Sequence, residues 1–418
     1  CRLGPLRPRP LRIVARESHL TTLRPAWHAA AEQPLPAAAL GIPRFRSCHA
    51  AFTLVLQTEI DFRFFRVMPS TPHRLPMTIR DVSGKAGVSP ATVSRVFNAP
   101  QTVRPLLRER VQAAARELGY RPNRSARSLR TQRTHALGVV LPTLLNPVFA
   151  ECLQGIAQAA MVGGYSIVPI TTDYELAHET RAAELLLARG VDALILCVAN
   201  AARSAVLKRL RAAQAPYVLV YNRHARHPCV SVDGRAAVAT LIGRLHTLGH
   251  RRILMVSGAL ARSDRAQQRH QGYQRGMQQA GLDPQLLEVP FLDGAVERIA
   301  AHLAACHRTP HMPTALVCSN DLLAIRSVRA ARQVGLRVPE DLSVTGFDGI
   351  ALGEDLTPAL STIVQPNAEI GRHSVELLLQ ALAGSALPGA ATSLTLDLHF
   401  RDGESIAAPP ALPSVSPT

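Results

Sequence analysis

The sequence predicts a small all-α headpiece of the helix-turn-helix type, followed by an α/β core of two lobes, each a doubly wound parallel sheet. Two observations predict this fold class. Residues 77–98 read as two short helices joined by a tight turn, and strand-like segments alternate with helix-like segments from residue 134 onward. Positive charge is concentrated in the segment before the alternating pattern, since residues 77–134 hold eleven Arg and one Lys against three acids.

Capping and turn residues predict the helix-turn-helix. Thr78 is an N-cap candidate for the first helix, and Gly87 suits a turn that needs a positive φ. Ser89 is placed to cap the second helix, with Pro90 at its first position, where a missing N–H costs nothing. The apolar residues on one face of that helix are Val93, Val96 and Phe97. A third helix over residues 100–119 completes a headpiece that spans residues 77–122.

The net charge of residues 77–134 decides between two interpretations of this hairpin. An ordinary helical hairpin in a protein core would usually carry mixed charges on its solvated face. A net charge of +9 within this segment is typical of a polyanion binder instead. We therefore expect the headpiece to bind double-stranded DNA, with the second helix in the major groove.

Alternating segments predict the two lobes of the core, which spans residues 135–402. The strand-like segments are 136–141, 165–170, 191–198, 217–221, 252–257, 315–319 and 342–347. The helix-like segments are 148–162, 177–188, 203–212, 235–247, 266–279, 295–305 and 321–334. Right-handed crossovers place helices on both faces of such sheets. Ligands of such folds lie at the carboxyl ends of the strands, here in the cleft between the lobes.

The two ends of the chain lack the periodicity of folded segments. Residues 1–76 hold eleven Arg, four acids and ten Pro, and we expect them to be disordered or a non-native extension ahead of Met77. Residues 403–418 are rich in Pro, Ala and Ser and are expected to form a disordered tail. No run of eighteen apolar residues suggests a membrane span, and the seven Cys are scattered without a CxxC pair. This pattern predicts a cytoplasmic protein with reduced thiols, no metal site and no cofactor.

Six motifs carry a more specific signal. They are TIRDVSGKAGVSPATVSRVFN, ERVQAAARELGYRPNRSARSLRT, LGVVLPTLLNPVFAECLQGI, LGHRRILMVSG, SNDLLAI and GLRVPEDLSVTGFD. Together they resemble the lactose-repressor family (LacI/GalR type) of bacterial transcription regulators, over about residues 77–400. The resemblance implies a periplasmic-binding-protein-like core whose chain crosses between the lobes three times, with a helix over 367–382 returning to the first lobe. It also implies a homodimer that binds an inverted-repeat operator and responds to a small sugar or sugar acid, and it leaves open whether dimers pair into tetramers.

DNA contacts are expected along the second helix and just after the headpiece. Pro90, Ala91 and Arg95 occupy the exposed start and middle of that helix, and for Arg95 a guanine contact is favoured over a phosphate contact. Ala91 could touch a thymine methyl group or contribute nothing. The remaining expected contacts, mainly structural or to the DNA backbone, are Thr78, Ser89, Thr92, Ser94, Asn98, Arg121 and Asn123.

Residues 123–134 form a linker or hinge helix between headpiece and core. The segment NRSARSLR (123–130) is too short and basic to be a stable helix alone, so a flexible linker is one interpretation. The resemblance implies instead a helix that folds on DNA beside its twin in the dimer. Leu129 would then wedge into the minor groove at the operator centre, with Ala126 as the small contact beside it.

The effector site is expected in the cleft between the lobes, from loop positions after strands and from the resemblance. The residues are Asn146, Phe149, Asp173, Arg265, Gln267, Asp321 and Gln365. Asp321 follows a strand and opens a helix, so a capping role competes with effector binding, and Asp348 is as well explained by a structural role. Relatives usually place the effector arginine at the Gln267 position. The segment ARSDRAQQRHQGY instead resembles the gluconate-repressor branch, with the arginine two residues earlier at Arg265, where a guanidinium suits a sugar-acid carboxylate.

These observations predict a repressor of a carbon-utilisation operon, controlled by a small sugar or a sugar acid such as gluconate. One alternative is a regulator of the same family that responds to a neutral sugar or a nucleobase. A solute-binding protein of a transporter would share the two lobes, but the headpiece argues against it. An enzyme on this framework is not supported, because no nucleophile elbow, Walker loop or other catalytic constellation is present.

We expect Leu129→Ala to weaken operator binding and to reduce DNA bending, because the apolar wedge that offsets base unstacking is lost. Binding to random DNA should barely change, since it depends on phosphate contacts. Gel-shift and bending assays on an inverted-repeat operator and on random DNA measure both effects. Equal losses on the two DNAs would refute the wedge role.

Overall fold

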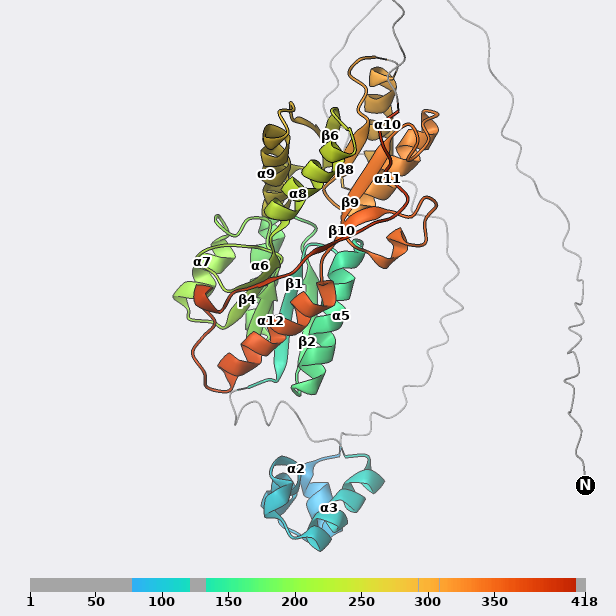
Figure 1. Ribbon diagram of the computed structural model, residues 1–418. Coiled ribbons are helices and arrows are strands. Elements are labelled where there is room, and N and C mark those ends of the chain that lie inside the picture. The colour runs from blue at the N-terminus through green and yellow to red at the C-terminus, as the bar shows by residue number, and fades with distance from the viewer. Residues whose placement is uncertain (1–76, 121–132, 292, 308, 411–418) are drawn as a thin grey trace, which may run out of the picture. The chain divides into compact units, whose positions relative to one another are not determined.

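The computed structural model describes residues 77–120, 133–291, 293–307 and 309–410 (Figure 1). Residues 77–120 form the headpiece, with helices α1 (Ile79–Ala86), α2 (Pro90–Asn98) and α3 (Pro105–Leu118). Thr78 precedes α1 and donates its backbone N–H to the Asp81 carboxylate at 2.7 Å. Gly87 has φ +61° between α1 and α2, and Ser89 caps α2 by accepting from the N–H of Thr92. The helix-turn-helix predicted from these residues is confirmed.

The headpiece closes around a small apolar core of its own. The buried residues are Val82, Ala86, Val93, Val96, Val111, Ala114 and Ala115. Because Val93 and Val96 point into this core, the opposite side of α2 remains exposed, with Pro90, Ala91 and Arg95 on it.

The two-lobed part contains two six-stranded sheets (Figure 1). The sheet of lobe 1 has the order β11-β5-β4-β3-β1-β2 and that of lobe 2 the order β12-β10-β9-β8-β6-β7. Neighbouring strands are parallel except for β12, which is antiparallel to β10. The strands are β1 (Ala136–Leu141), β2 (Ser166–Thr171), β3 (Ala193–Leu196), β4 (Tyr217–Val220), β5 (Cys229–Val232), β6 (Ile253–Ser257), β7 (Gln285–Glu288), β8 (Ala315–Cys318), β9 (Ser343–Asp348), β10 (Ser361–Val364), β11 (Leu394–Leu396) and β12 (His399–Arg401).

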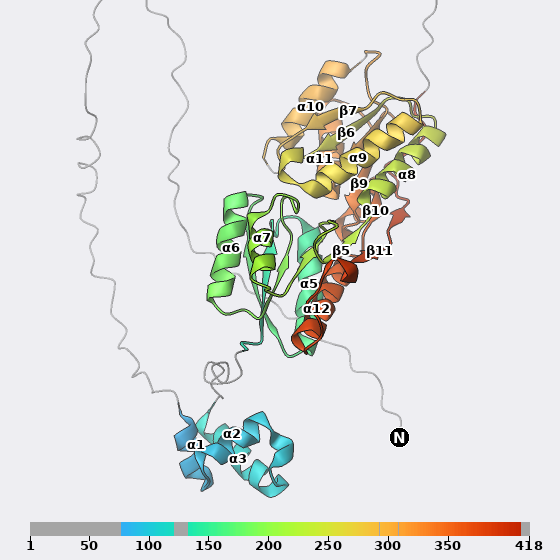
Figure 2. The same ribbon diagram turned by 90° about the vertical axis from the view of Figure 1, so that its left-hand side faces the viewer.

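Helices cover both faces of each sheet, as expected for a doubly wound fold (Figure 2). In lobe 1, α5 and α12 pack on one face and α6 and α7 on the other. In lobe 2, α8 and α9 pack on one face and α10 and α11 on the other. The helices are α5 (Pro147–Val162), α6 (Leu176–Ala188), α7 (Ala205–Ala212), α8 (Gly234–Thr247), α9 (Asp264–Gln279), α10 (Ala295–Cys306), α11 (Asp321–Gln333) and α12 (Asn367–Leu382). No helix within the described ranges is long and apolar enough to cross a membrane.

The chain crosses between the lobes three times, after β5, after β10 and between β11 and β12. The second crossing returns the chain to lobe 1, where α12 packs along α5. This confirms the two-lobed fold class and the return of the helix over 367–382. The predicted helices and strands of the core agree with observed elements to within about two residues, the usual uncertainty at element ends, but β5, β7, β10, β11 and β12 were not predicted. The third headpiece helix, predicted over residues 100–119, is wrong at its start, since α3 begins at Pro105 and Pro100–Thr102 form a separate short 3-10 helix. Pro105 disfavours the helical conformation at the residue before it, so the two helical segments do not join.

The prediction of a disordered tail over 403–418 is wrong for residues 403–410, which pack against lobe 2. Ser405 is fully buried, and its hydroxyl donates to the Val344 carbonyl at 2.6 Å. The Ala407 carbonyl accepts from the Ser343 hydroxyl at 3.1 Å and from the His250 ring at 2.9 Å. Composition alone missed this segment because its order comes from partners more than forty residues away in sequence. Residues 411–418 lie outside the described ranges.

Glycines allow the closest helix contacts in the core. A Cβ added at Gly155 of α5 would lie 2.0 Å from the Ala368 carbonyl oxygen of α12, and one at Gly371 of α12 would lie 2.2 Å from the Cys152 carbonyl oxygen. In lobe 2, a Cβ at Gly272 of α9 would lie 2.3 Å from a backbone oxygen of α8. The helix pairs thus approach backbone to backbone, which no residue with a Cβ permits.

Gly155→Ala should destabilise the protein by about 1–3 kcal/mol, because the added methyl group meets backbone that cannot move aside. Gly243→Ala is the matched control, since Gly243 lies exposed in α8 with nothing within 4 Å of the added Cβ. It should stabilise the protein by about 0.5–1 kcal/mol through helix propensity. Urea unfolding measures both, and a Gly155→Ala protein as stable as the parent would contradict the packing argument.

Candidate functional site in the pocket between the lobes

A pocket of about 420 Å³ lies between the two lobes, at the carboxyl ends of the strands. Its volume is in the range of small-molecule sites, roughly 300–1,000 Å³. Both lobes contribute to its walls. The polar and charged residues that line it are Thr143, Asn146, Asp173, Tyr174, Tyr221, Arg262, Ser263, Arg265, Arg269, Ser319, Asn320, Asp348 and Gln365.

Arg265 projects into the pocket from the first turn of α9, whose N-terminus is capped by Ser263. The guanidinium is buried, and its Nη1 donates to the Val198 carbonyl at 2.7 Å, while the Asp264 carboxylate lies 3.5 Å away. Its Nη2 is also buried and has no hydrogen-bond partner among the described residues. An unpaired buried donor costs about 1–3 kcal/mol, so an acceptor beside this nitrogen would stabilise the site.

Arg269 follows four residues later and therefore lies on the same face of α9. Its guanidinium carbon lies 3.7 Å from the centroid of the Phe347 ring. One terminal nitrogen donates to the Ser319 carbonyl, and the other lies 3.3 Å from the Asp348 carboxylate. Burial lowers the pKa of Arg269, and the Asp348 charge opposes this change. Arg269 is thus a positioned and already paired cation.

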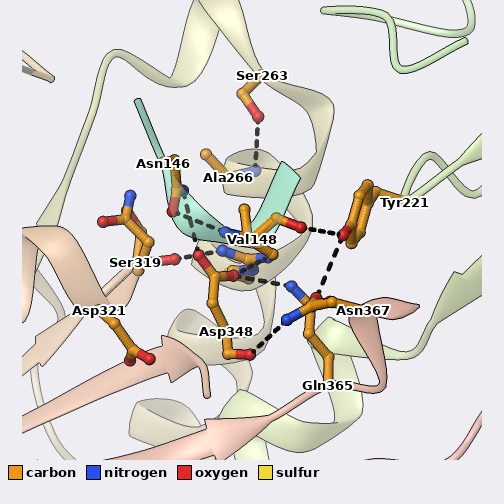
Figure 3. Close-up of polar contacts among 12 residues, drawn as sticks. Asn146, Val148, Tyr221, Ser263, Ala266, Ser319, Asp321, Asp348, Gln365 and Asn367 are labelled. Atoms are coloured by element: carbon orange, nitrogen blue, oxygen red, sulfur yellow. Dashed lines mark hydrogen bonds and ion pairs between the residues drawn. The ribbon is translucent and has the colours of Figure 1, made fainter. Parts of the chain in front are cut away.

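Asp348 lies at the centre of the polar contacts in Figure 3. Its carboxylate accepts from Gln365 Nε2 at 2.8 Å and from Asn146 Nδ2 at 3.4 Å, and its backbone carbonyl accepts from Asn367 Nδ2 at 3.2 Å. Burial raises the pKa of Asp348 to about 6, although the Arg269 charge opposes this rise. Because Asn146 belongs to lobe 1 and Asp348 to lobe 2, this carboxylate joins the lobes at the floor of the pocket.

Gln365 lies at the second crossing between the lobes and is held in one orientation. Only its NH₂ group can donate to the Asp348 carboxylate, so the amide oxygen faces away from that contact. This Oε1 is buried and has no partner among the described residues. Two residues that line the pocket, Arg265 and Gln365, therefore each hold a buried polar atom without a partner among the described residues.

Backbone strain is concentrated in the pocket walls. Six described residues other than glycine have a positive φ, and four of them line the pocket. They are Asp173 (+52°), Tyr174 (+60°), Tyr221 (+66°) and Asp348 (+120°). Such conformations cost on the order of 1–3 kcal/mol each and cluster at functional sites.

Aromatic rings supply the apolar part of the pocket. Phe149 and Tyr221 meet edge to face with centroids 5.6 Å apart, within lobe 1. Tyr174 of lobe 1 and Phe291 of lobe 2 lie 5.6 Å apart at a tilt of 55°. These rings offer apolar faces beside fixed polar groups, the usual composition of a small-molecule site.

The structure brings together five of the seven effector residues predicted from the sequence. Asn146, Phe149, Asp173, Arg265 and Gln365 all line the pocket. That an effector contacts these five residues stays a prediction.

The structure places Asp321 and Gln267 elsewhere, which corrects two of the expected positions. Asp321 is fully buried, accepts from the Ile350 N–H at 2.8 Å and from the Thr362 hydroxyl, and lies apart from the Asp348 cluster (Figure 3). It opens α11 with its carboxylate against Gly346 of β9 and Thr362 of β10, whereas the preceding Asn320 lines the pocket. Gln267 is two residues beyond Arg265, on another side of α9, and its amide donates to the Leu260 carbonyl at 2.8 Å.

Sequence reasoning missed several lining residues. Arg269 could have been found from its spacing of four residues to Arg265, which places both on one helix face. Asn320 could have been chosen over Asp321 from the alternation of directions at a strand end. Tyr174, Tyr221 and Phe291 lie in loops and carry no periodic signal.

The DNA-binding face predicted for α2 is partly constrained by internal contacts. Asn98 donates its amide to the Ser94 carbonyl at 2.8 Å and to its hydroxyl at 3.1 Å, and Thr92 bonds the Ser89 hydroxyl at 3.0 Å. Arg95 is exposed on the same helix. The other predicted DNA contacts, Arg121, Asn123, Ala126 and Leu129, lie outside the described residues.

The described part of the chain holds no group of three or more His, Cys, Asp or Glu side chains that could bind a metal ion. Its described cysteines are unpaired, and all but Cys306 are buried. Burial raises the pKa of the Cys197 thiol to about 12, which disfavours thiolate chemistry beside the pocket.

Comparisons with known proteins agree with this geometry. Residues 78–123 match the family model described as bacterial regulatory proteins, lacI family, and residues 242–403 match a periplasmic binding protein-like domain. The HTH-type transcriptional repressor CytR of Escherichia coli (strain K12) is 31% identical over 329 residues, which cover 78% of this chain and 95% of the relative. The HTH-type transcriptional regulator GntR of the same strain is 30% identical over 326 residues, or 77% of this chain and 96% of the relative.

A solved structure shows the same arrangement of elements. The crystal structure of the lac repressor dimer, bound to operator and the anti-inducer ONPF, superimposes with a TM-score of 0.71 at 27% identity. The match covers 80% of this chain and all of the lac repressor chain.

The buried Asp321 carboxyl should make stability depend on pH. Burial, with the nearby Asp348 charge, raises the pKa of Asp321 to about 7. The folded state then holds a proton that the unfolded state releases above pH ~4, so this group's contribution to stability falls as pH rises from ~4 to ~7. Asp321→Asn, which does not titrate, should reduce the fall in melting temperature between pH 5 and pH 8. Asp397→Asn, at an exposed position, is the control, and an undiminished fall in the Asp321→Asn protein would contradict the assignment.

Proposed function

The chain belongs to the lacI family of bacterial regulatory proteins, and from this we propose a repressor of a carbon-utilisation operon whose effector is a sugar acid such as gluconate. As a member of that family it is a DNA-binding transcription regulator with a periplasmic-binding-protein-like core, and not an enzyme. The proposal concerns the ligand, the contacts that read the operator and the assembly.

The buried and unpaired Nη2 of Arg265 is the observation that carries the sugar-acid proposal. A ligand carboxylate would satisfy this donor with a charge-assisted hydrogen bond, which is stronger than a neutral one. Both lobes contribute to the pocket around it, and the Arg265 guanidinium is buried, where such a bond is worth more than at a surface. The placement of this arginine two residues before Gln267 is also the pattern of the gluconate-repressor branch.

The unpaired acceptor on Gln365 complements this anion site. A sugar acid carries hydroxyl donors along the chain that extends from its carboxylate, and one of them would donate to Gln365 Oε1. Thr143 and Ser263 line the same pocket and offer further hydroxyl partners. Phe149 and Tyr221 would pack against the carbon chain.

A neutral sugar is the second candidate, and the charge balance of the pocket favours it. The Arg269 charge is paired with Asp348, and the Asp264 carboxylate lies 3.5 Å from Arg265. A hydroxyl oxygen of a neutral sugar would satisfy Arg265 Nη2 without adding a further negative charge beside these carboxylates.

For operator recognition we propose that Pro90, Ala91 and Arg95 face the bases, and that Thr92 and Ser94 contact phosphate. Exposure of Arg95 on the side of α2 opposite the headpiece core supports this assignment. The hinge-helix role of Ala126 and Leu129 remains part of the proposal.

We propose that the assembly is a homodimer on an inverted-repeat operator. Met161 and Val162, at the end of α5, are 73% and 88% exposed. Exposed large apolar side chains of this kind are available to a second copy. A homodimer also matches the two half-sites of an inverted repeat.

Arg265→Ala should reduce affinity for D-gluconate roughly thirtyfold, because one charged buried hydrogen bond of about 2 kcal/mol is lost. Affinity for D-glucose should fall less, since no carboxylate loses its partner. Isothermal titration calorimetry measures both. Arg262→Ala is the matched control, because Arg262 also lines the pocket but is exposed and paired with Glu175.

The control should change gluconate affinity less than about threefold, as expected for a surface ion pair. Preference of the parent protein for neutral sugars would overturn the sugar-acid assignment, as would an Arg265→Ala protein with unchanged gluconate affinity. Neither result would affect the assignment of the chain as a DNA-binding regulator.

A further inference from the structure

The first turn of α9 belongs to lobe 2 but is hydrogen-bonded to lobe 1. The backbone N–H of Asp264 donates to the Ala199 carbonyl at 2.7 Å, and the Asp264 carboxylate accepts from the Ala201 N–H at 3.1 Å. Asn222 Nδ2 donates to the same carboxylate, at 2.8 and 2.9 Å from its two oxygens. Residues 199–201 follow β3 and Asn222 follows β4, so Asp264 holds the ends of two lobe 1 strands.

Asn222, which follows β4, also bonds the backbone of Val198, which follows the neighbouring strand β3. We call these contacts of Asp264, Asn222 and residues 198–201 the joint between the lobes. The Asn222 side chain is fully buried, accepts from the Val198 N–H at 2.9 Å and donates to the Val198 carbonyl at 2.8 Å. An amide that bonds a backbone N–H, a backbone C=O and a carboxylate has little freedom to move. The Asp264–Asn222 pair, with residues 198–201, therefore forms a rigid connection between the lobes.

Arg265, which lines the pocket, is bonded to the same joint. Arg265 directly follows Asp264, and its Nη1 donates to the Val198 carbonyl, the group that also accepts from Asn222. Asp264 does not itself line the pocket, whereas Arg265 does. A ligand that draws Arg265 Nη2 toward the pocket would thus act on Val198 and Asp264, which bind lobe 1 to lobe 2.

The lobes are also joined by an exposed ion pair, which differs from the buried contacts of Asp264. Arg262 and Glu175 also connect lobe 2 to lobe 1, but their side chains are 59% and 47% exposed. Exposed pairs contribute little and rearrange readily. The Asp264 side chain is 13% exposed, so its bonds are lost only at the cost of unpaired buried groups.

We propose that Asp264 is a positioning residue that couples occupancy of the pocket to the arrangement of the two lobes, through Asn222 and the Val198–Ala201 segment. The coupling to a sugar acid rests on the proposed function, whereas the joint itself does not. Asp264 would hold Arg265 for the ligand and transmit its displacement to lobe 1. Its loss should impair the response to ligand more than it impairs folding or DNA binding.

The test uses the full chain with Asp264→Asn and Asp264→Ala, and Arg262→Gln as the matched control that breaks the exposed pair. The asparagine variant keeps the side-chain volume and one acceptor oxygen, so it remains informative if the alanine variant fails to fold. Hydrogen exchange in the ligand-free proteins reports the joint directly. The amide of Ala201 should exchange about tenfold faster in the Asp264 variants, because its acceptor is weakened or removed, and should be unchanged in the control.

Operator binding with and without D-gluconate reports the coupling. Ligand-free operator affinity of the Asp264 variants should stay within about threefold of the parent, while the change that saturating gluconate causes should fall about tenfold or more. A parent-like gluconate response in both variants would overturn the proposal, and so would unchanged Ala201 exchange. If the parent protein itself does not bind gluconate, the sugar-acid proposal fails and the exchange measurement alone decides on the joint.

Discussion

Asp348 is a carboxylate that the fold holds between two lobes, away from water. Burial of an ionised carboxylate costs several kcal/mol unless other groups replace its hydration. The replacements come from three separate parts of the chain, Asn146, Arg269 and Gln365, so the carboxylate is satisfied only when all three are in place. The pocket depends on this requirement, because those same side chains form its floor.

The same requirement explains the unpaired oxygen of Gln365, whereas the unpaired nitrogen of Arg265 has a separate cause. Gln365 uses its NH₂ group on Asp348, which leaves its amide oxygen without a donor. Arg265 uses one nitrogen on the Val198 carbonyl and leaves the other free. In a core of this density such groups are rare, and their position in one pocket is consistent with a ligand that carries both an acceptor and a donor.

Close helix packing makes each lobe rigid. Gly155 and Gly371 let α5 and α12 meet backbone to backbone, and Gly272 does the same for α9 against α8. Such contacts do not slide easily, so we expect relative movement at the three crossings and at the contacts between the lobes. The Asp264–Asn222 joint is one of these contacts, and Asp264 directly precedes Arg265, which lines the pocket.

The amino-acid sequence by itself determined the parts of this protein whose cause is local. Ser89, Pro90 and Gly87 specify the helix-turn-helix, because capping and left-handed turns depend on neighbouring residues. The alternating periodicity specified the α/β core, and the motif around Arg265 located one of the three arginines that line the pocket. Only the tertiary structure decided that Asn320 and not Asp321 faces the pocket, that Arg269 is paired with Asp348, and that residues 403–410 are ordered. These outcomes depend on contacts between segments distant in sequence, where the direction of one side chain is set by the packing of strands and helices that no local pattern encodes.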